Sequence, residues 1–257
     1  PLDFEFTRAI VHVPAVPFSL TFGTVGYVPL QSFNENAASD LDAAIRDLQA
    51  RGAKGVILDL RRNPGGILDQ SLAVSNLFLK PGLEIASVRG RNGDNQSYTA
   101  RGQPTLPNVP MIVLTDDGSA SASEIVAGAL QDHDRAVIVG QTSFGKGLVQ
   151  SVYPLDGGYA LKLTTAKWFT PSGRSIQRER KFVDGHFVEE AARDSLETEA
   201  SKKDRPAYKS EAGRVVYGGG GITPDVIVPD DTIGTGDQQL ARALAPRQEF
   251  YTLLLDY

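Results

Sequence analysis

The chain of 257 residues contains no cysteine and only three histidines. Without cysteine it cannot use a thiolate nucleophile, and with three histidines it offers few candidates for a histidine-based catalytic triad. It also has no apolar run of the roughly 18 residues that a membrane-spanning helix needs. If the chain carries out covalent catalysis, a serine nucleophile with a lysine base is the simplest chemistry that remains.

Charge and hydrophobicity narrow the class of protein further. The net charge of −5 argues against nucleic acid as the main partner. With 41% hydrophobic residues the chain can bury a sizeable core, in one large domain or in one domain with a small appendage. Apolar patterns predict strands at 2–11, 25–30, 55–60, 83–88, 96–100, 111–114, 136–139, 149–153, 159–165 and 222–229, and helices at 41–48, 67–80 and 121–131. This alternation predicts an α/β fold of βαβ units.

One segment interrupts this pattern. Residues 178–214 are dense in mixed charge and poor in large apolar side chains, and four glycines follow at 218–221. Such composition predicts a solvated insertion or a flexible flap, and the functional alternative is a lid over an active site. The resulting division is a core at 23–174, a charged insertion at 175–217, a return strand of the core at 218–230 and a C-terminal segment at 231–257.

The first chemical motif is the run SASASE at residues 119–124. Ser121 and Glu124 match the capping-box pattern, so a purely structural interpretation is a helix N-cap. The functional interpretation is a nucleophile: the two flanking alanines leave room for a substrate carbonyl, and a helix N-terminus offers free N–H groups where an oxyanion forms. By composition alone, Ser119 and Ser123 are rival nucleophiles.

The second motif surrounds a lysine. Lys146 follows Ser121 by 25 positions, between two glycines and near the apolar residues Phe144 and Leu148. A lysine acts as a base only when it is neutral, and burial among apolar walls favours that form. The alternative is a surface lysine in a turn. If the segment is extended, Gln150 lies on the same face as Lys146, because side chains two and four positions apart align in a strand.

Two other patterns are weaker. His133 and Asp132 invite a Ser-His-Asp interpretation, but sequence neighbours rarely form the base and its orienting partner, and we treat Asp132 as structural. Residues 140–147 (GQTSFGKG) nearly match a phosphate-binding loop, but the final Ser or Thr that would hold Mg²⁺ is absent and the next segment looks like a strand. We therefore do not expect nucleotide hydrolysis.

Three separated segments together resemble a known family. They are DLRRNPGG at 59–66, SASASE at 119–124 and TSFGKGLVQ at 142–150, and the resemblance spans roughly 7–174 and 221–229. The chain resembles the carboxyl-terminal processing proteases, or tail-specific proteases, of the S41 serine peptidase family. The family's sites imply Ser121 as nucleophile, Lys146 as base and Gln150 as its orienting partner. They also imply an oxyanion hole of Ala122 N–H with Gly66 N–H, or Gly65 N–H, and supporting roles for Glu124 and Ser143, which stands where the family usually has threonine.

The resemblance also implies a fold and an activity. We expect an α/β core of the ClpP/crotonase type and a serine endopeptidase that cuts near protein C-termini through an acyl-enzyme. The alternative is a non-catalytic binding or scaffold member of the same fold, although such a relative should lack the Ser-Lys pair. Residues 1–22 are expected to hold the last strand of a PDZ domain and a linker, with the rest of that domain missing and its contribution to tail recognition lost.

The expected surroundings follow from the same resemblance. Substrates would be proteins or peptides with free C-termini, and membrane-associated substrates and a homo-oligomer are compatible with it. No nucleic acid, nucleotide, metal or other cofactor is expected as a partner. The expected location is extracytoplasmic, in the periplasm or cell envelope, with the plastid lumen as the second choice.

Overall fold

The computed structural model describes residues 7–8, 13–91, 93, 95–178 and 205–229, and the backbone alone of 180–183 and 186–189. Contacts divide the chain into Pro1–Ile227 and Val228–Tyr257, and nearly all described residues belong to the first unit. The predicted strand over 2–11 and the C-terminal segment at 231–257 lie largely or wholly outside the described residues.

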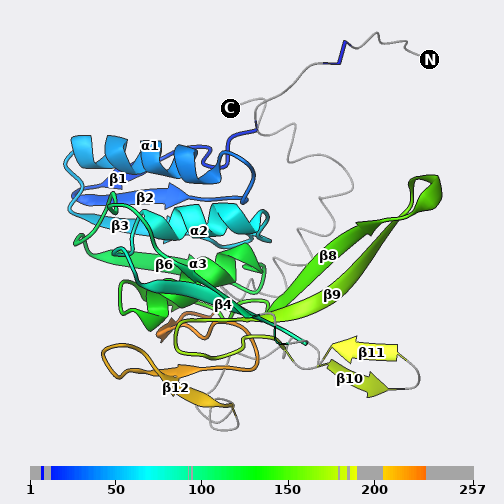
Figure 1. The fold of residues 1–257 in the computed structure, drawn as a ribbon. Helices are drawn as coiled ribbons and strands as arrows, with labels where there is room; N and C mark the ends of the chain where they lie inside the picture. Colours follow the sequence, from blue (N-terminus) through cyan, green and yellow to red (C-terminus); the bar gives the residue numbers. More distant parts are fainter. Residues whose placement is uncertain are drawn as a thin grey trace, which may run out of the picture. The chain divides into compact units, whose positions relative to one another are not determined.

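A six-stranded sheet forms the centre of the first unit (Figure 1). Its order is β1 (Leu20–Phe22), β2 (Val25–Pro29), β3 (Gly55–Asp59), β6 (Met111–Thr115), β7 (Val137–Gly140) and β14 (Val226–Ile227). Every neighbouring pair is parallel except β1 and β2, which form an antiparallel hairpin. The α/β prediction with a parallel sheet is therefore confirmed.

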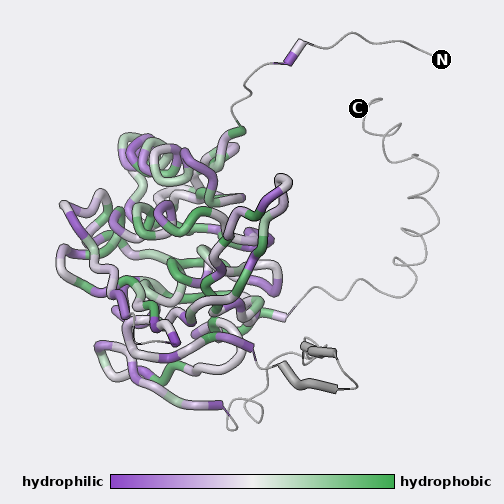
Figure 2. The backbone as a smooth tube through the Cα atoms, turned by 45° about the vertical axis from the view of Figure 1, so that its right-hand side comes forward, coloured by the Kyte–Doolittle hydropathy of each residue, from purple (hydrophilic) through white to green (hydrophobic). Residues whose placement is uncertain are grey.

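Three helices connect these strands: α1 (Ala37–Ala50), α2 (Leu68–Asn76) and α3 (Ala122–Asp132). The apolar positions predicted for α1 are Leu41, Ala44, Ile45 and Leu48. The three larger side chains are fully buried and Ala44 is half-buried. α2 ends at Asn76, earlier than predicted. The apolar residues Phe78 and Leu79 that follow are buried as well, but they lie in a turn. Hydrophobic stretches lie mainly inside the body of this unit and hydrophilic ones mainly in the surrounding loops (Figure 2). None of the helices in the described part has the length and apolar character needed to cross a bilayer.

A second, antiparallel sheet has the order β5 (Asn95–Thr99), β4 (Glu84–Gly90), β9 (Ala160–Phe169) and β8 (Leu148–Pro154). The 3₁₀ turn Asp156–Gly158 joins β8 to β9, and this long hairpin extends away from the three helices (Figure 1). Two short hairpins follow in the chain, β10 (Arg180–Val183) with β11 (His186–Glu189), and β12 (Ala207–Lys209) with β13 (Val215–Tyr217).

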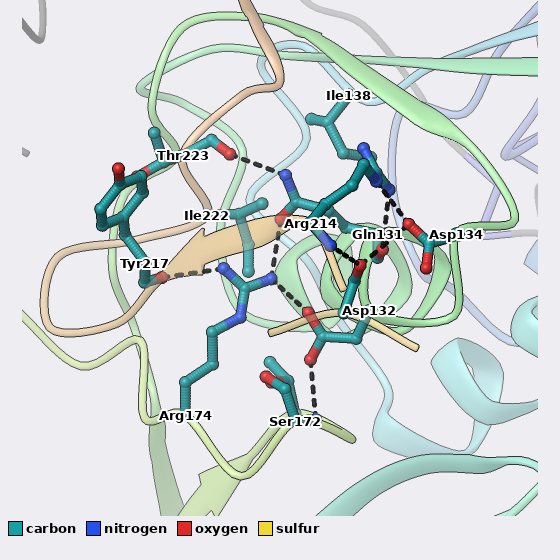
Figure 3. Close-up of polar contacts among 12 residues, drawn as sticks. Gln131, Asp132, Asp134, Ile138, Ser172, Arg174, Arg214, Tyr217, Ile222 and Thr223 are labelled. Carbon is teal, nitrogen blue, oxygen red and sulfur yellow. Dashed lines mark hydrogen bonds and ion pairs between the residues drawn. The ribbon is translucent and has the colours of Figure 1, made fainter. Parts of the chain in front are cut away.

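A buried polar cluster attaches the β12–β13 region to the C-terminal end of α3 (Figure 3). The Arg174 guanidinium, 0% exposed, donates hydrogen bonds to Asp132 Oδ1 at 2.7 Å, Gln131 Oε1 at 2.7 Å and the Tyr217 carbonyl at 2.8 Å. Nearby, Arg214 forms an ion pair with Asp134. Arg214, which lies within the predicted insertion, is thus bonded to the end of α3 and to Asp134 just beyond it. The composition of the insertion alone does not indicate this contact.

Candidate active site

The three sequence motifs meet at one edge of the parallel sheet. Residues 59–66 follow β3, residues 116–121 follow β6, and residues 141–147 follow β7. Because the carboxyl ends of parallel strands share an edge, loops that are far apart in sequence come together there. The loops are hydrogen-bonded to one another, since Ala120 N–H donates to the Asn63 carbonyl at 3.0 Å and Phe144 N–H donates to the Ser119 carbonyl at 3.0 Å.

Ser121 lies immediately before α3 in an unusual backbone conformation, with φ 56° and ψ −111°. A non-glycine residue with positive φ costs on the order of 1–3 kcal/mol and persists only where the surrounding structure enforces it. Such strain is common at active sites, and in some hydrolases it presents a nucleophilic serine at a sharp turn before a helix. The backbone of Ser121 therefore has a feature that a simple N-cap does not require.

The rival serines have different surroundings. Ser119 is 1% exposed and its hydroxyl donates to the Leu60 carbonyl at 2.7 Å. Ser123 is 0% exposed and its hydroxyl donates to the Asn63 carbonyl at 2.9 Å. Both hydroxyls hold neighbouring loops together inside the fold, whereas Ser121 is only half-buried.

Two glycines allow close backbone packing of the 59–66 loop, Gly65 against the serine segment and Gly66 against Phe33. A methyl group added at Gly65, whose φ is +94°, would lie 2.6 Å from the Ala120 carbonyl oxygen and 2.8 Å from the Ala122 nitrogen. One added at Gly66 would lie 2.3 Å from the Phe33 carbonyl oxygen. The close approach of backbone to backbone requires the absence of a Cβ at both positions.

The N–H groups of these glycines differ. Gly65 N–H donates to Asn63 Oδ1 at 2.9 Å, so it already has a partner. Among the hydrogen bonds of the described residues, none uses the N–H of Gly66 or of Ala122. Of the two glycines considered from the sequence, Gly66 is therefore the one with an available donor.

Glu124 connects the serine loop to the lysine loop. Its carboxylate is fully buried and accepts four hydrogen bonds. Oε1 accepts from Ser143 Oγ at 2.5 Å and Gly145 N–H at 2.7 Å, and Oε2 accepts from Ser121 N–H at 2.8 Å and Lys146 N–H at 2.9 Å. Because the last two share one oxygen atom, the backbone nitrogens of Ser121 and Lys146 are no farther apart than the sum of those distances. Burial raises the pKa of Glu124, and the four donors oppose that effect.

Lys146 and Gln150 line the same pocket, which has a volume of about 220 Å³. The pocket is lined by Phe144, Gly145, Lys146, Leu148, Gln150, Gln177 and Arg178. β8 begins only at Leu148 and carries a bulge between Val149 and Gln150, so simple strand alternation does not apply from 146 to 150. The two side chains still face one space, but Ser121 is not among the residues that line it.

Sequence reasoning missed two residues that line this pocket, Gln177 and Arg178, which follow β9 in the chain. Gln177 Oε1 accepts a hydrogen bond from Gly147 N–H at 2.9 Å, and Arg178 N–H donates to the Gly145 carbonyl at 3.0 Å. Neither residue belongs to a motif that sequence reasoning recognised. Their role follows from packing against the two glycines beside Lys146, which the sequence does not reveal.

The structure does not bring His133 and Asp132 together with Ser121 as a Ser-His-Asp triad. His133 caps the opposite end of α3 from Ser121, roughly 18 Å away at 1.5 Å per residue. Its Nε2 lies 2.7 Å from the Glu84 carbonyl oxygen, and Asp132 pairs with Arg174 instead. The segment after residues 140–147 is the strand β8, as expected, so it does not provide the helix N-terminus of a phosphate-binding loop.

Known proteins are similar to this chain in sequence and in fold. The sequence model of Peptidase family S41 matches residues 24–184. A carboxy-terminal-processing protease of Bartonella bacilliformis is 51% identical over 182 residues, which are 69% of this chain and 42% of that protein. The carboxy-terminal processing protease CtpA of Bacillus subtilis is 39% identical over 178 residues, 69% of this chain and 38% of that protein. The chain therefore spans less than half the length of these curated relatives.

Solved structures agree with this likeness. A photosystem II D1 C-terminal processing protease is 34% identical, with a TM-score of 0.57 over 64% of this chain and 41% of that chain. An S41 protease structure from Bacteroides fragilis, at 19% identity and a TM-score of 0.61, covers 95% of this chain and supports the fold alone. Since the family model matches more than half of the chain, this protein belongs to Peptidase family S41.

Proposed function

We propose that this chain is the catalytic part of a carboxyl-terminal processing serine protease that uses a Ser121–Lys146 dyad. The observation that carries the proposal is the shared Glu124 oxygen, which accepts hydrogen bonds from the backbone N–H groups of both residues. This buried carboxylate holds the backbone nitrogens of the two residues close together, which supports the dyad, and it does so without requiring contact with substrate. The relatives in Bartonella bacilliformis and Bacillus subtilis are carboxy-terminal processing proteases, which supports protein C-termini as the substrate class.

The proposed reaction is acyl transfer. The Lys146 amine takes the proton of the Ser121 hydroxyl while Ser121 Oγ attacks the carbonyl carbon of the scissile peptide bond. The Lys146 ammonium gives that proton to the leaving amine as the C–N bond breaks. Water then loses a proton to Lys146 and attacks the acyl-enzyme ester, and Lys146 returns the proton to Ser121 Oγ as the ester bond breaks and the product carboxyl group is released. Gln150 lines the same pocket as Lys146 and orients the amine of the Lys146 side chain.

The oxyanion of the tetrahedral intermediate would be bound by the N–H groups of Ala122 and Gly66. Two observations support this choice: neither N–H is used by another described residue, and Gly65 N–H is already bonded to Asn63. Removal of one such donor costs about 100- to 1,000-fold in rate in a serine protease. Ser121 is the N-cap residue of α3 and has a strained φ. Such strain is common at active sites, which supports the same arrangement.

The place of action is part of this proposal. We expect the protease to work outside the cytoplasm, in the periplasm or cell envelope, on proteins or peptides with free C-termini. Membrane-associated substrates and a homo-oligomer are compatible with this assignment.

A serine-directed fluorophosphonate tests the nucleophile directly. Intact protein should form an adduct that peptide mapping places on Ser121, and Ser121→Ala should abolish labelling, whereas Ser97→Ala on the exposed strand β5 should label normally. Labelling that persists in Ser121→Ala and maps to Ser119 or Ser123 would contradict the assignment. An unlabelled intact protein with normal circular dichroism would favour a non-catalytic member of the fold.

The base needs its own variant. Lys146→Ala and Lys146→Arg should both lose labelling and peptide cleavage, because neither restores an amine at the same reach. Lys80→Ala, which removes an exposed lysine outside the pocket, is the matched control. Full activity in Lys146→Ala would refute the dyad.

A further inference from the structure

The pocket beside Lys146 has an unusual charge balance. Among its described lining residues, Arg178 carries a permanent positive charge and none is acidic. The remaining walls include Phe144, whose side chain is 41% exposed, and Leu148. A half-enclosed space whose described walls are apolar and carry the Arg178 guanidinium is suited to an anionic group on a peptide.

Arg178 is held in place by its backbone. Its N–H donates to the Gly145 carbonyl at 3.0 Å, and its carbonyl accepts from Gln177 Nε2 at 2.8 Å. A methyl group added at Gly145 would lie 3.0 Å from Arg178 Cβ, so the start of the side chain packs directly on the lysine loop. The position of the arginine relative to Lys146 is therefore set by the same loop that carries the lysine.

The guanidinium, in contrast, has few partners. It forms no ion pair with any described residue, and its one hydrogen bond within the described part of the chain is a long one, 3.4 Å to the Ser143 carbonyl. Both ends of the neighbouring Gln177 amide have a partner, because its oxygen accepts from Gly147 N–H and its nitrogen donates to the Arg178 carbonyl. Among the described residues that line this pocket, Arg178 is thus the permanently charged donor that is available to a ligand.

We propose that Arg178 binds a carboxylate of the substrate in this pocket, next to the scissile bond. The planar guanidinium can donate two parallel hydrogen bonds to a carboxylate, which a peptide amide cannot match. The carboxylate comes either from the free C-terminus of the substrate or from an acidic side chain near it. This inference rests on the proposed function, since it places the ligand beside the proposed base.

Binding of matched peptides to the Ser121→Ala protein tests the proposal without any need for turnover. Three N-terminally labelled decapeptides differ only at the tail: a free acid with penultimate Gln, its C-terminal amide, and the same amide with penultimate Glu. Fluorescence anisotropy gives the Kd of each for Ser121→Ala alone and combined with Arg178→Gln, Arg178→Lys or the control Arg101→Gln. Arg101 is exposed and does not line the pocket.

With Arg178 present, a carboxylate peptide should bind about 10- to 100-fold more tightly than the Gln amide, as expected for a hydrogen-bonded charge pair. Arg178→Gln should abolish this preference, Arg178→Lys should retain part of it, and Arg101→Gln should leave it unchanged. Preference for the free acid identifies the C-terminus as the source, and preference for the Glu amide identifies a side chain.

Two results would overturn the inference: a preference that survives Arg178→Gln, or equal or unmeasurable binding of all three peptides to Ser121→Ala. Fluorophosphonate labelling of the chain with Ser121 intact is read separately. Normal labelling with no carboxylate preference would refute the role of Arg178 and leave the dyad standing, whereas Arg178-dependent binding without labelling would refute the dyad alone.

Discussion

A single methyl group at Gly65 tests whether the 59–66 loop shapes the oxyanion site. In Gly65→Ala the new Cβ would lie 2.6 Å from the Ala120 carbonyl oxygen and 2.8 Å from the Ala122 nitrogen, and both are backbone atoms that no rotamer change can move. Non-bonded heavy atoms prefer separations of about 3.5–4.0 Å, so one of the two loops must shift by roughly 1 Å. The shift displaces the Ala122 N–H from the place where the oxyanion would form.

The cost has two parts. A non-glycine residue at the left-handed φ of +94° loses about 1–2 kcal/mol of folding free energy, and overpacking adds about 1–3 kcal/mol. Gly102→Ala isolates the first part, because Gly102 also has a positive φ, +75°, but a methyl group there would meet nothing within 4 Å. We therefore expect Gly65→Ala to be destabilised by about 2–5 kcal/mol and Gly102→Ala by about 1–2 kcal/mol.

Activity should separate the two variants more sharply than stability. Loss of one aligned oxyanion donor predicts a fall of about 100- to 1,000-fold in the rate of peptide cleavage for Gly65→Ala, with fluorophosphonate labelling slowed as well. Gly102→Ala should retain normal rates at a temperature where both variants are folded. Urea denaturation gives the free energies, and labelling kinetics give the reactivity. If Gly65→Ala labels and cleaves as fast as Gly102→Ala, Gly65 does not shape the oxyanion site.

Two further predictions concern buried charges. Burial raises the pKa of Glu124 above its ordinary 4.5, so the carboxyl group binds its proton more tightly in the folded chain than in the unfolded chain. The free energy of unfolding of the native protein, relative to Glu124→Gln, should therefore be highest below pH 4.5. This difference should shrink as the pH rises through the pKa of Glu124 in the folded chain. Urea titrations at several pH values, with Glu35→Gln as control, check this, and an advantage that grows with pH would contradict it. Arg174→Met leaves Asp132 buried without its cation and should cost about 3–5 kcal/mol, whereas Arg101→Met should cost little; a loss below about 1 kcal/mol in thermal or urea unfolding would refute this role for the pair.

Local patterns predicted most of the secondary structure. The spacing of Leu41, Ile45 and Leu48 identified the buried face of α1, because it depends only on helical geometry. The predicted end of α2 at Lys80 was wrong, because the helix ends at Asn76. Phe78 and Leu79 are as buried as helical core residues, but they lie in the turn that follows. An apolar run shows that a segment is buried and does not show whether it is still helical.

The relation between Lys146 and Gln150 illustrates a different limit. Strand alternation was a sound argument for a shared face, yet the strand begins only after Lys146 and contains a bulge before Gln150. Both side chains nevertheless line one pocket, because Gln177 and Arg178 pack against the lysine loop and shape the space. Packing contacts that the sequence does not reveal thus bring the two residues to one pocket, and the orienting role of Gln150 stays a prediction.

The sequence by itself determined the α/β class, the three motifs and the short-range pairing of Ser121 with Glu124. These depend on periodicity and on contacts within a few residues. Only the tertiary structure decided what Glu124 does beyond that pairing, since its other three donors come from positions 19 to 22 residues later. It also decided that Gly65 N–H is occupied while Gly66 N–H is available, and it placed Arg178 beside Lys146. The physical reason is that burial and hydrogen-bond partners are properties of packed elements, and a chain acquires them only when strands far apart in sequence align at one edge of a sheet.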